Sequence, residues 1–409
     1  MRAEVINTGS ELLLGQVVNT HLAYLGEQLF TLGFRIGRQL AIPDGAEILQ
    51  ALEESFARKP DVLFVTGGLG PTTDDITRDL LADWLGVKLI LHPESLRLIE
   101  ERFAKRGFVM NERIARQAYV PEGVQPMLND WGTAPGLYLP AGEKWPATFF
   151  LPGPPRELRP MFRERVTPLL RDLFPVAGDV QCQVYRVVGL GESMVEERVG
   201  ARLLALPGLE LGYCARSGEV DLRVVGGLDT IALAGAIIEE ALAANIYARN
   251  EGTMEQSVVE LLRGKKRTLA TAESCTGGFL AHRITNVPGA SEIFPAGFVS
   301  YANAIKTSEL GVDPALLADH GAVSEAVAGA MAAGARGQTG TDYALSTTGI
   351  AGPGGGSPDK PVGTVFIGLA TSGEVSVSKH FFPTDRETFK YLVSQTALNR
   401  LREALLENG

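Results

Sequence analysis

The chain has 409 residues, which is too long for one ordinary core and predicts two or three domains of ~150 residues each. Apolar residues make up 45% and charged residues 21%, a composition typical of globular proteins that argues against long disordered stretches. The formal net charge of −10 argues against broad electrostatic binding to nucleic acid or to anionic membranes.

The cysteines and the apolar pattern indicate the compartment. Cys182, Cys214 and Cys275 show no paired metal-ligand spacing, so we expect a reducing compartment and neither a disulfide framework nor a structural zinc site. The N-terminus does not read as a signal peptide. No run approaches 18 uninterrupted apolar residues. The sequence therefore predicts a cytoplasmic protein that does not bind a membrane.

The first third of the chain alternates strand and helix patterns. Continuous apolar strands are expected at 3–8, 61–66 and 148–151, and a helix at 19–32 has apolar side chains at helical spacing. This alternation predicts a parallel sheet covered by helices on both faces.

The remaining two thirds divide into a small and a larger α/β-type region. The small region has a strand at 181–188, a helix at 192–204, two strands flanking Ser217-Gly218 and a helix at 230–243. Nothing in it indicates catalysis, so we expect it to connect or pair the larger domains. The last region is again α/β, with helices expected at 253–262, 324–335 and 386–406 and strands at 268–272, 297–302, 343–347 and 363–370.

The segment TAESCTGG places Ser274 where an expected strand gives way to a helix. A nucleophile there would have helix N-terminal N–H groups to stabilise an oxyanion, although a serine at such a junction also fits a helix N-cap. Lys306 would serve as the base if burial lowers its pKa, and otherwise it is a solvated surface lysine. Cys275 is an alternative nucleophile, because a helix N-terminus can lower a thiol pKa.

Two glycine-rich loops follow expected strands. The loop TTGIAGPGGGS at 347–357 suits a phosphate but matches neither the Walker nor the dinucleotide pattern. The loop VTGGLGPTTDD at 65–75 offers backbone N–H groups for phosphate, and its two aspartates suit a hard divalent cation. Taken alone, each loop also fits a simple turn.

Three C-terminal segments together resemble the nicotinamide-nucleotide amidase domain of the CinA (competence/damage-inducible) family. They are TAESCTGG, the run from Pro288 through VSYANAIK to LGV, and TTGIAGPGGG with KPVGTV. The resemblance implies hydrolysis of nicotinamide mononucleotide (NMN) to nicotinic acid mononucleotide and ammonia, without a cofactor. It implies Ser274 as the nucleophile and Lys306, assisted by Tyr301, as the proton acceptor. It also implies substrate binding, at the oxyanion by Cys275, Thr276, Gly277 and Gly278, and at the phosphate or ribose by Gly349, Gly352, Gly354 and Gly355.

The N-terminal segments TGSELLLG at 8–15, TGGLGPTTDD at 66–75 and LPGPPRE at 151–157 resemble the molybdopterin-binding fold. Ser10 and His21 stand where molybdopterin enzymes usually carry Asp and Asn, which favours the CinA subgroup over cofactor assembly. The resemblance then implies a metal-dependent ADP-ribose pyrophosphatase that uses Mg, Mn or Co. Its implied metal ligands are Asp74, Asp75 and Glu11, and its implied nucleotide-binding residues are Thr66, Gly67, Gly68, Gly70, Thr72, Gly153, Pro154 and Arg156. The segment 129–136 is expected to border the same cleft.

The resemblance covers nearly the whole chain and predicts an α/β protein of three domains. Residues 1–171 are expected to form a molybdopterin-binding-like three-layer domain, 172–250 a small α+β domain, and 251–409 an α/β amidase domain. The expected protein is a homodimeric, bifunctional enzyme of NAD salvage. Two alternatives stay open: a non-catalytic scaffold in competence or the DNA damage response, and an N-terminal domain that only binds a nucleotide. The acidic balance and the lack of a basic-aromatic patch count against direct nucleic-acid contact.

Overall fold

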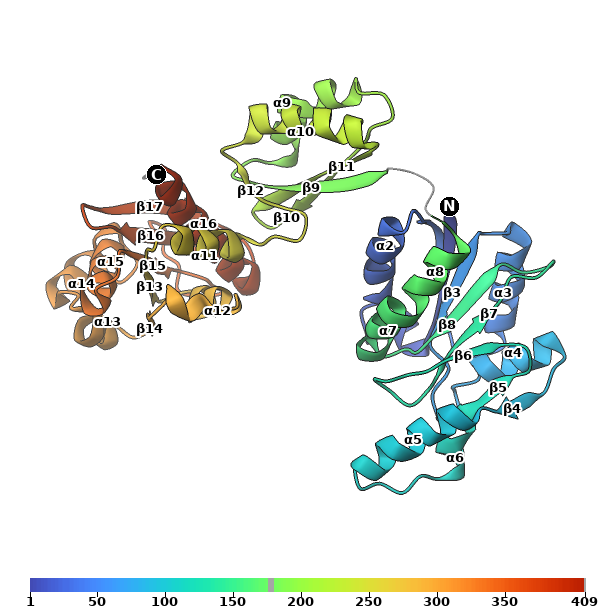
Figure 1. Ribbon diagram of the computed structural model, residues 1–409. Coiled ribbons are helices and arrows are strands. Elements are labelled where there is room, and N and C mark those ends of the chain that lie inside the picture. Colours follow the sequence, from blue (N-terminus) through green and yellow to red (C-terminus); the bar gives the residue numbers. More distant parts are fainter. Residues whose placement is uncertain (176–179, 408–409) are drawn as a thin grey trace. The chain divides into compact units, whose positions relative to one another are not determined.

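The computed structural model describes residues 1–175 and 180–407 and divides the chain into two compact units, Met1–Gly178 and Asp179–Gly409. Both units combine helices with sheets, so the predicted α/β class is confirmed (Figure 1). The predicted middle and C-terminal domains fall together in the second unit, and the boundaries at 171/172 and 250/251 stay predictions. Within the described residues, none of the helices is long and apolar enough to cross a membrane.

The first unit is built on a six-stranded sheet in the order β2-β1-β3-β8-β7-β6. Its parallel part consists of β1 (Arg2–Thr8), β2 (Arg35–Ile42), β3 (Val62–Thr66) and β8 (Ala147–Leu151). The expectation of a parallel sheet is wrong at one edge, where β7 (Gly136–Leu139) and β6 (Gln125–Met127) run antiparallel. A separate two-stranded ladder joins β4 (Leu89–Leu91) to β5 (Tyr119–Pro121).

Helices cover both faces of this sheet because neighbouring strand residues point to opposite sides. Val5 belongs to one core, with α2 (His21–Thr31) and α7 (Pro155–Met161), whereas Ile6 belongs to the other, with α3 (Glu47–Arg58) and α4 (Thr77–Leu85). The other helices of this unit are α1 (Ser10–Leu13), α5 (Pro93–Lys105), α6 (Glu112–Ala115), η1 (Arg116–Ala118), η2 (Phe162–Val166) and α8 (Thr167–Leu173).

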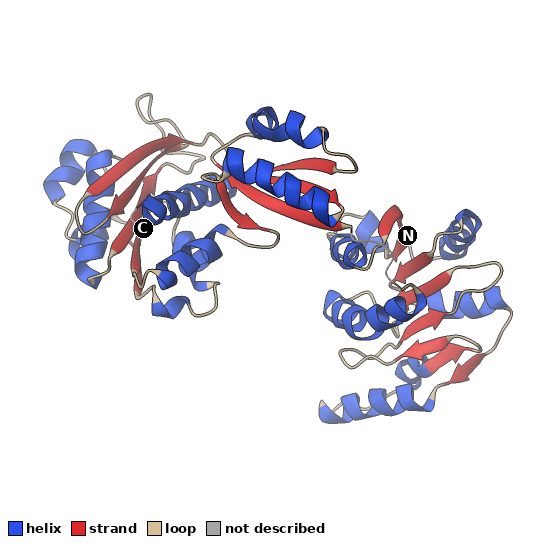
Figure 2. Cartoon of the chain, turned by 45° about the horizontal axis from the view of Figure 1, so that its top comes forward, coloured by secondary structure: helices blue, strands red, loops and turns tan. Residues whose placement is uncertain are grey.

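The second unit begins with a middle segment, residues 180–250, that forms an antiparallel sheet in the order β10-β11-β9-β12. Two helices pack on this sheet through one apolar core (Figure 2). The elements are β9 (Gln181–Val188), α9 (Glu192–Leu204), β10 (Glu210–Arg216), β11 (Glu219–Gly226), α10 (Leu228–Leu242) and β12 (Ile246–Arg249).

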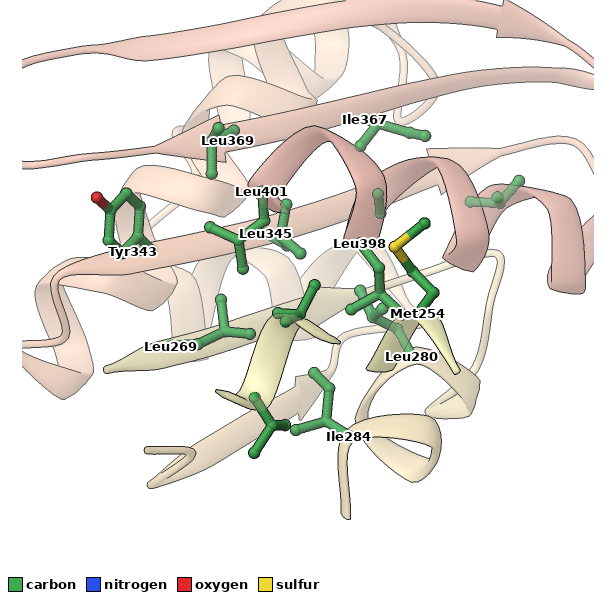
Figure 3. Packing of buried hydrophobic residues seen from close by; sticks show 14 of the residues in the cluster. Met254, Leu269, Leu280, Ile284, Tyr343, Leu345, Ile367, Leu369, Leu398 and Leu401 are labelled. Carbon is green, nitrogen blue, oxygen red and sulfur yellow. The ribbon is translucent and has the colours of Figure 1, made fainter. Parts of the chain in front are cut away.

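The C-terminal segment, residues 251–407, has a five-stranded sheet in the order β14-β13-β15-β16-β17. The strands β13 (Leu269–Glu273), β14 (Ala296–Val299) and β15 (Tyr343–Gly349) are parallel, whereas β16 (Thr364–Ala370) and β17 (Val375–Phe381) are antiparallel. On one face pack α11 (Met254–Gly264), α12 (Phe279–Thr285) and α16 (Arg386–Glu407), and Figure 3 shows some of the side chains that fill this core. The other face carries α13 (Asn303–Leu310), α14 (Pro314–His320) and α15 (Glu325–Thr339), and η3 (Ala290–Glu292) is a single turn.

The contact between α13 and α15 depends on one glycine. A Cβ added to Gly334, in the middle of α15, would lie 1.9 Å from the carbonyl oxygen of Leu310, the last residue of α13. The missing side chain lets α15 support the helix that carries Lys306.

We expect Gly334→Ala to destabilise the C-terminal segment by about 1–3 kcal/mol, because the backbone of α13 must move away from the new methyl group. The matched control is Gly337→Ala in the same helix, where the added Cβ meets nothing within 4 Å. That control should stabilise the helix by up to about 1 kcal/mol. Urea unfolding of both variants, followed by circular dichroism, checks the pair. Equal stability of the two variants would contradict the role given to Gly334.

Candidate functional site

Ser274 lies at the carboxyl edge of the C-terminal sheet, directly after β13. The amide of Ser274 donates to the carbonyl of Thr347 on β15 (2.9 Å), which anchors the residue beside the neighbouring strand. A turn at 274–278 then precedes α12, which begins at Phe279. The prediction that the helix opens at Ser274 is therefore wrong by one turn.

A buried carboxylate, Glu273, organises this turn. It accepts hydrogen bonds from the Thr276 hydroxyl (2.6 Å) and from the amides of Gly278 (3.0 Å), Leu280 (3.0 Å) and Ala281 (2.8 Å). Glu273 is fully buried and satisfies the free N–H groups at the start of α12. Ser274 is thus not the helix cap, and its hydroxyl is available for another role. Sequence reasoning missed Glu273, although a carboxylate ending a buried strand was a usable signal.

Lys306 is placed against Ser274 by α13. Its Nζ lies 3.1 Å from Ser274 Oγ, 2.7 Å from the carbonyl oxygen of Ser300 and 3.2 Å from that of Tyr301. The side chain is fully buried, so the interpretation of Lys306 as a surface lysine is wrong. Burial lowers the pKa of Lys306, because an ammonium ion loses its hydration there.

The three contacts of Lys306 can be made by an ammonium ion, which donates to all three oxygens, or by a neutral amine. Such an amine has two N–H donors and one lone pair. The two N–H groups can donate to the carbonyls of Ser300 and Tyr301, and the lone pair is then left to accept the Ser274 hydroxyl. In this protonation state the geometry is that of a general base and its nucleophile.

The phenol of Tyr301 is not brought against Lys306. The residue is 61% exposed, and its phenol oxygen accepts a hydrogen bond from Arg386 at the start of α16 (3.0 Å). Arg386 also donates to the carbonyl of Gly352 in the glycine-rich loop (2.8 Å). Only the backbone of Tyr301 contacts the amine, and the assisting role of its phenol stays a prediction. Sequence reasoning missed Arg386, which no motif marked.

The other predicted residues of this site differ in burial and in whether their backbone amides already donate a hydrogen bond. Gly277 and Gly278 have amides that already donate, to the Ser274 carbonyl and to Glu273. Cys275 and Thr276 are both buried and supply the remaining amides of the turn. In the glycine-rich loop, Gly349 ends β15 paired with Val365, Gly352 is buried, and Gly354 and Gly355 are exposed.

The thiol of Cys275 does not have the lowered pKa that a helix N-terminus suggested. It is buried, and desolvation raises its pKa to about 12. At neutral pH the thiol is therefore protonated and a weak nucleophile. That prediction is wrong because the turn buries the sulfur instead of presenting it to the helix dipole.

The N-terminal unit has a cleft of about 340 Å³ at the carboxyl ends of its central strands. Many predicted residues line it: Glu11, Gly67, Gly68, Gly70, Asp74, Asp75, Gly153 and Pro154. Thr133 and Ala134 of the segment 129–136 border it as well. Three predicted residues lie outside its lining: Thr66, Thr72 and Arg156. Thr66 is buried, and its hydroxyl accepts a hydrogen bond from the Asn7 side-chain amide. Arg156 is exposed.

The carboxylates of this cleft are of the ligand type that a hard divalent cation prefers, because Mg²⁺ and Mn²⁺ bind oxygen ligands. One carboxylate oxygen of Asp75 is already engaged, because Oδ2 accepts hydrogen bonds from the amide (2.8 Å) and the hydroxyl of Thr72. Asp44 also lines the cleft and was missed by sequence reasoning. In the part of the chain that the structure describes, no three His, Cys, Asp or Glu residues are grouped as a ready metal site. Such a cation would need ligands from the substrate, as Mg²⁺ commonly takes from phosphates.

His21 supports one wall of the cleft. Its Nε2 lies 2.6 Å from the carbonyl oxygen of Gly153, and the ring is buried. Burial lowers the pKa of His21, so the imidazole is neutral near pH 7 and donates its N–H to this carbonyl. The residue therefore fixes the loop that carries Gly153 and Pro154.

Comparison with known proteins finds a family match for the N-terminal and for the C-terminal part of the chain. Residues 4–172 match the family described as "Probable molybdopterin binding domain", and residues 251–405 match "CinA C-terminal domain". A CinA-like protein of Akkermansia muciniphila is 46% identical over 406 residues, covering 99% of this chain and 97% of the relative. A CinA-like protein of Dictyoglomus thermophilum is 42% identical over 414 residues, covering 99% and 100%.

Among solved structures, a competence-damaged protein (CinA) superfamily protein of Klebsiella pneumoniae is 32% identical, with a TM-score of 0.37. The match covers 38% of this chain and 96% of that protein. The relatives that are aligned over nearly the full length carry the assignment. The chain, with its molybdopterin-binding-like N-terminal domain and its CinA C-terminal domain, belongs to the CinA family.

Proposed function

We propose that the C-terminal site hydrolyses the carboxamide of NMN, with Ser274 as the nucleophile and Lys306 as the base. The observation that carries this proposal is the fully buried amine 3.1 Å from the Ser274 hydroxyl, at the carboxyl edge of the sheet. The choice of NMN as substrate rests on the resemblance of three segments around these residues to the nicotinamide-nucleotide amidase domain.

The reaction then needs only these two side chains, the turn and water. The Ser274 proton moves to Nζ of Lys306 as Oγ bonds to the amide carbon, and the carbonyl oxygen takes up negative charge. The C–N bond breaks, and the Lys306 ammonium returns the proton to the departing ammonia. Water then attacks the resulting ester with Lys306 again as base, which releases nicotinic acid mononucleotide and restores the Ser274 hydroxyl.

The oxyanion is expected to bind to the amides of Cys275 and Thr276. The amides of Gly277 and Gly278 are already committed within the turn, so two of the four predicted donors remain for a ligand. Glu273 fixes the conformation of the turn, and preorganised donors of this kind commonly supply a large part of the catalytic effect.

We further propose that the N-terminal cleft hydrolyses ADP-ribose to AMP and ribose 5-phosphate with a divalent metal ion. The supporting observation is that Glu11, Asp74 and Asp75 line the same cleft as Gly67, Gly68 and Gly70. A cation held by these carboxylates would polarise the diphosphate and favour ionisation of a bound water. The glycine amides would contact the phosphate oxygens, and Gly153 and Pro154 would form the opposite wall.

The first prediction concerns the nucleophile and its base. Purified protein should release ammonia and nicotinic acid mononucleotide from NMN, and Ser274→Ala should lower the rate by about 1000-fold or more. For the wild type, kcat/KM should rise with pH as Lys306 loses its proton, with an apparent pKa below the ordinary ~10.4 of lysine. Lys306→Met should be inactive at every pH. Full activity of Ser274→Ala, with its fold confirmed by circular dichroism, would remove the assignment.

The second prediction separates serine from cysteine as the nucleophile. Brief treatment with iodoacetamide at pH 8 should label the exposed Cys214 and leave Cys275 unlabelled, because the buried Cys275 thiol has a pKa of about 12. Mass spectrometry of the peptides measures the labelling, and NMN turnover is assayed on the same sample. A loss of turnover that follows labelling of Cys275 would point to the thiol instead.

The third prediction concerns the N-terminal cleft. ADP-ribose hydrolysis should require Mg²⁺, Mn²⁺ or Co²⁺, and Asp74→Asn should lower its kcat/KM by about tenfold or more while NMN turnover is unchanged. The matched control is Asp83→Asn, an exposed residue of α4 outside the cleft lining. If ADP-ribose binds but no metal supports its hydrolysis, the cleft only binds a nucleotide. If neither cleft nor C-terminal site turns over its substrate, the scaffold alternative gains support.

A further inference from the structure

A second cavity of about 790 Å³ lies where the middle segment meets the C-terminal segment. Arg216, the last residue of β10, and Ser217 of the turn that follows line it from the middle segment. Phe279 lines it from the start of α12, and Arg386 and Lys390 from the start of α16. No sequence motif marked this cavity, because Arg216 and Arg386 come from segments that lie far apart in the sequence.

The turn between β10 and β11 is held firmly against α16. Glu219 is buried, and its carboxylate accepts hydrogen bonds from Gln395 of α16 (2.8 Å) and from the Tyr247 hydroxyl. A Cβ added to Gly218, whose φ is +78°, would lie 3.0 Å from Leu392 of α16. Buried polar contacts of this kind fix one arrangement, since either partner left alone would be unsatisfied. The cavity wall from the middle segment is therefore a defined part of the structure.

The same cavity borders the site of Ser274. Phe279 directly follows the turn 274–278 that carries the nucleophile and the oxyanion amides. Arg386 lines the cavity and at the same time contacts Tyr301 and the carbonyl of Gly352, both of which belong to the site. The cavity and the site of Ser274 therefore share Arg386 and adjoin along the chain at Phe279.

The lining carries an excess of positive charge. Arg216, Arg386 and Lys390 face two carboxylates, Glu219 and Glu387, and Glu219 is already occupied by two donors. Arg216 pairs with Asp221 (2.7 Å), yet its side chain is 49% exposed and keeps further N–H groups for a ligand.

The other two cations have no acidic partner within the described residues: no ion pair there includes Arg386 or Lys390. The Lys390 ammonium instead lies 5.7 Å from the centre of the Phe279 ring, a cation–π distance, and both residues line the cavity. Unpaired cations beside a pocket are the usual receptor for a phosphate group.

We propose that this cavity binds the phosphate monoester of the mononucleotide substrate, and that the middle segment is thereby part of the amidase site. The inference rests on the proposed function of Ser274. The carboxamide lies at the turn 274–278, and the phosphate is bound by Arg216, Arg386 and Lys390. The middle segment then selects a nucleotide over the corresponding nucleoside, a role that connecting two domains does not require.

The test measures binding separately from turnover. Full-length Ser274→Ala protein is titrated with NMN and with nicotinamide riboside, which lacks the phosphate, by isothermal calorimetry. Two further variants remove cations: Arg216→Ala, and Lys390→Met, which keeps an apolar stem over Phe279 and leaves the Arg216–Asp221 pair intact. Arg223→Ala, an exposed residue of β11 outside the cavity lining, is the matched control, and the N-terminal cleft is the same in every variant.

We expect each cation variant to raise the Kd for NMN about tenfold or more and to leave the Kd for nicotinamide riboside unchanged, since only one of the two ligands carries the phosphate. Arg223→Ala should change neither. Unchanged NMN binding in both cation variants, or an equal loss for both ligands, would overturn the proposal.

If the expected pattern is found but the wild type releases no ammonia from NMN, the phosphate site stands and the amidase fails. If the wild type turns over NMN but neither substitution weakens NMN binding, the amidase stands and the phosphate site fails.

Discussion

The C-terminal segment has to accommodate one buried amine, that of Lys306, with hydrogen-bond partners and close packing. A lysine with no exposed surface is stable only if it loses its charge or finds an acidic partner, and burial lowers the pKa of Lys306. The carbonyls of Ser300 and Tyr301 can satisfy two of its N–H groups, and Nζ lies 3.1 Å from the Ser274 hydroxyl oxygen. The helix that carries the amine can reach this position because α15 has no side chain at Gly334. Packing and chemistry are therefore linked through a single helix contact.

Glu273 meets the complementary requirement on the other side of the site. A tight turn after a buried strand leaves several backbone N–H groups away from water, and each would cost free energy if unpaired. One carboxylate accepts three of them together with the Thr276 hydroxyl. The consequence is that Ser274 has no structural duty as a helix cap. The turn can present its hydroxyl and two amides to a ligand because another residue has taken over the local stabilisation.

The sequence predicted what depends on short-range pattern and missed what depends on distant partners. The strand at 181–188 and the helix at 192–204 were predicted with the bounds that β9 and α9 have, since apolar periodicity specifies both. The short strands β6 and β7 were missed, because three or four residues carry too little periodicity. The burial of Lys306 could not be predicted, because it depends on Ser274, 32 residues earlier in the chain, and on the packing of α13. The direction of the Tyr301 phenol depends on Arg386, 85 residues further along the chain. Asp44 likewise joins its cleft without any motif of its own.

The lowered pKa of Lys306 also has a thermodynamic consequence for the fold that contains it. In the unfolded chain this amine has the ordinary pKa of ~10.4 and is protonated, whereas the folded state binds the proton less tightly. Folding thus releases a proton wherever the pH lies between the two pKa values, and stability rises with pH across that interval. At a pH below the pKa of the folded state, Lys306 is protonated in both states. The full cost of burying the charged ammonium then lowers the free energy of unfolding. The lowered pKa of Lys306 therefore makes the stability of this segment depend on pH in a range set by one buried amine.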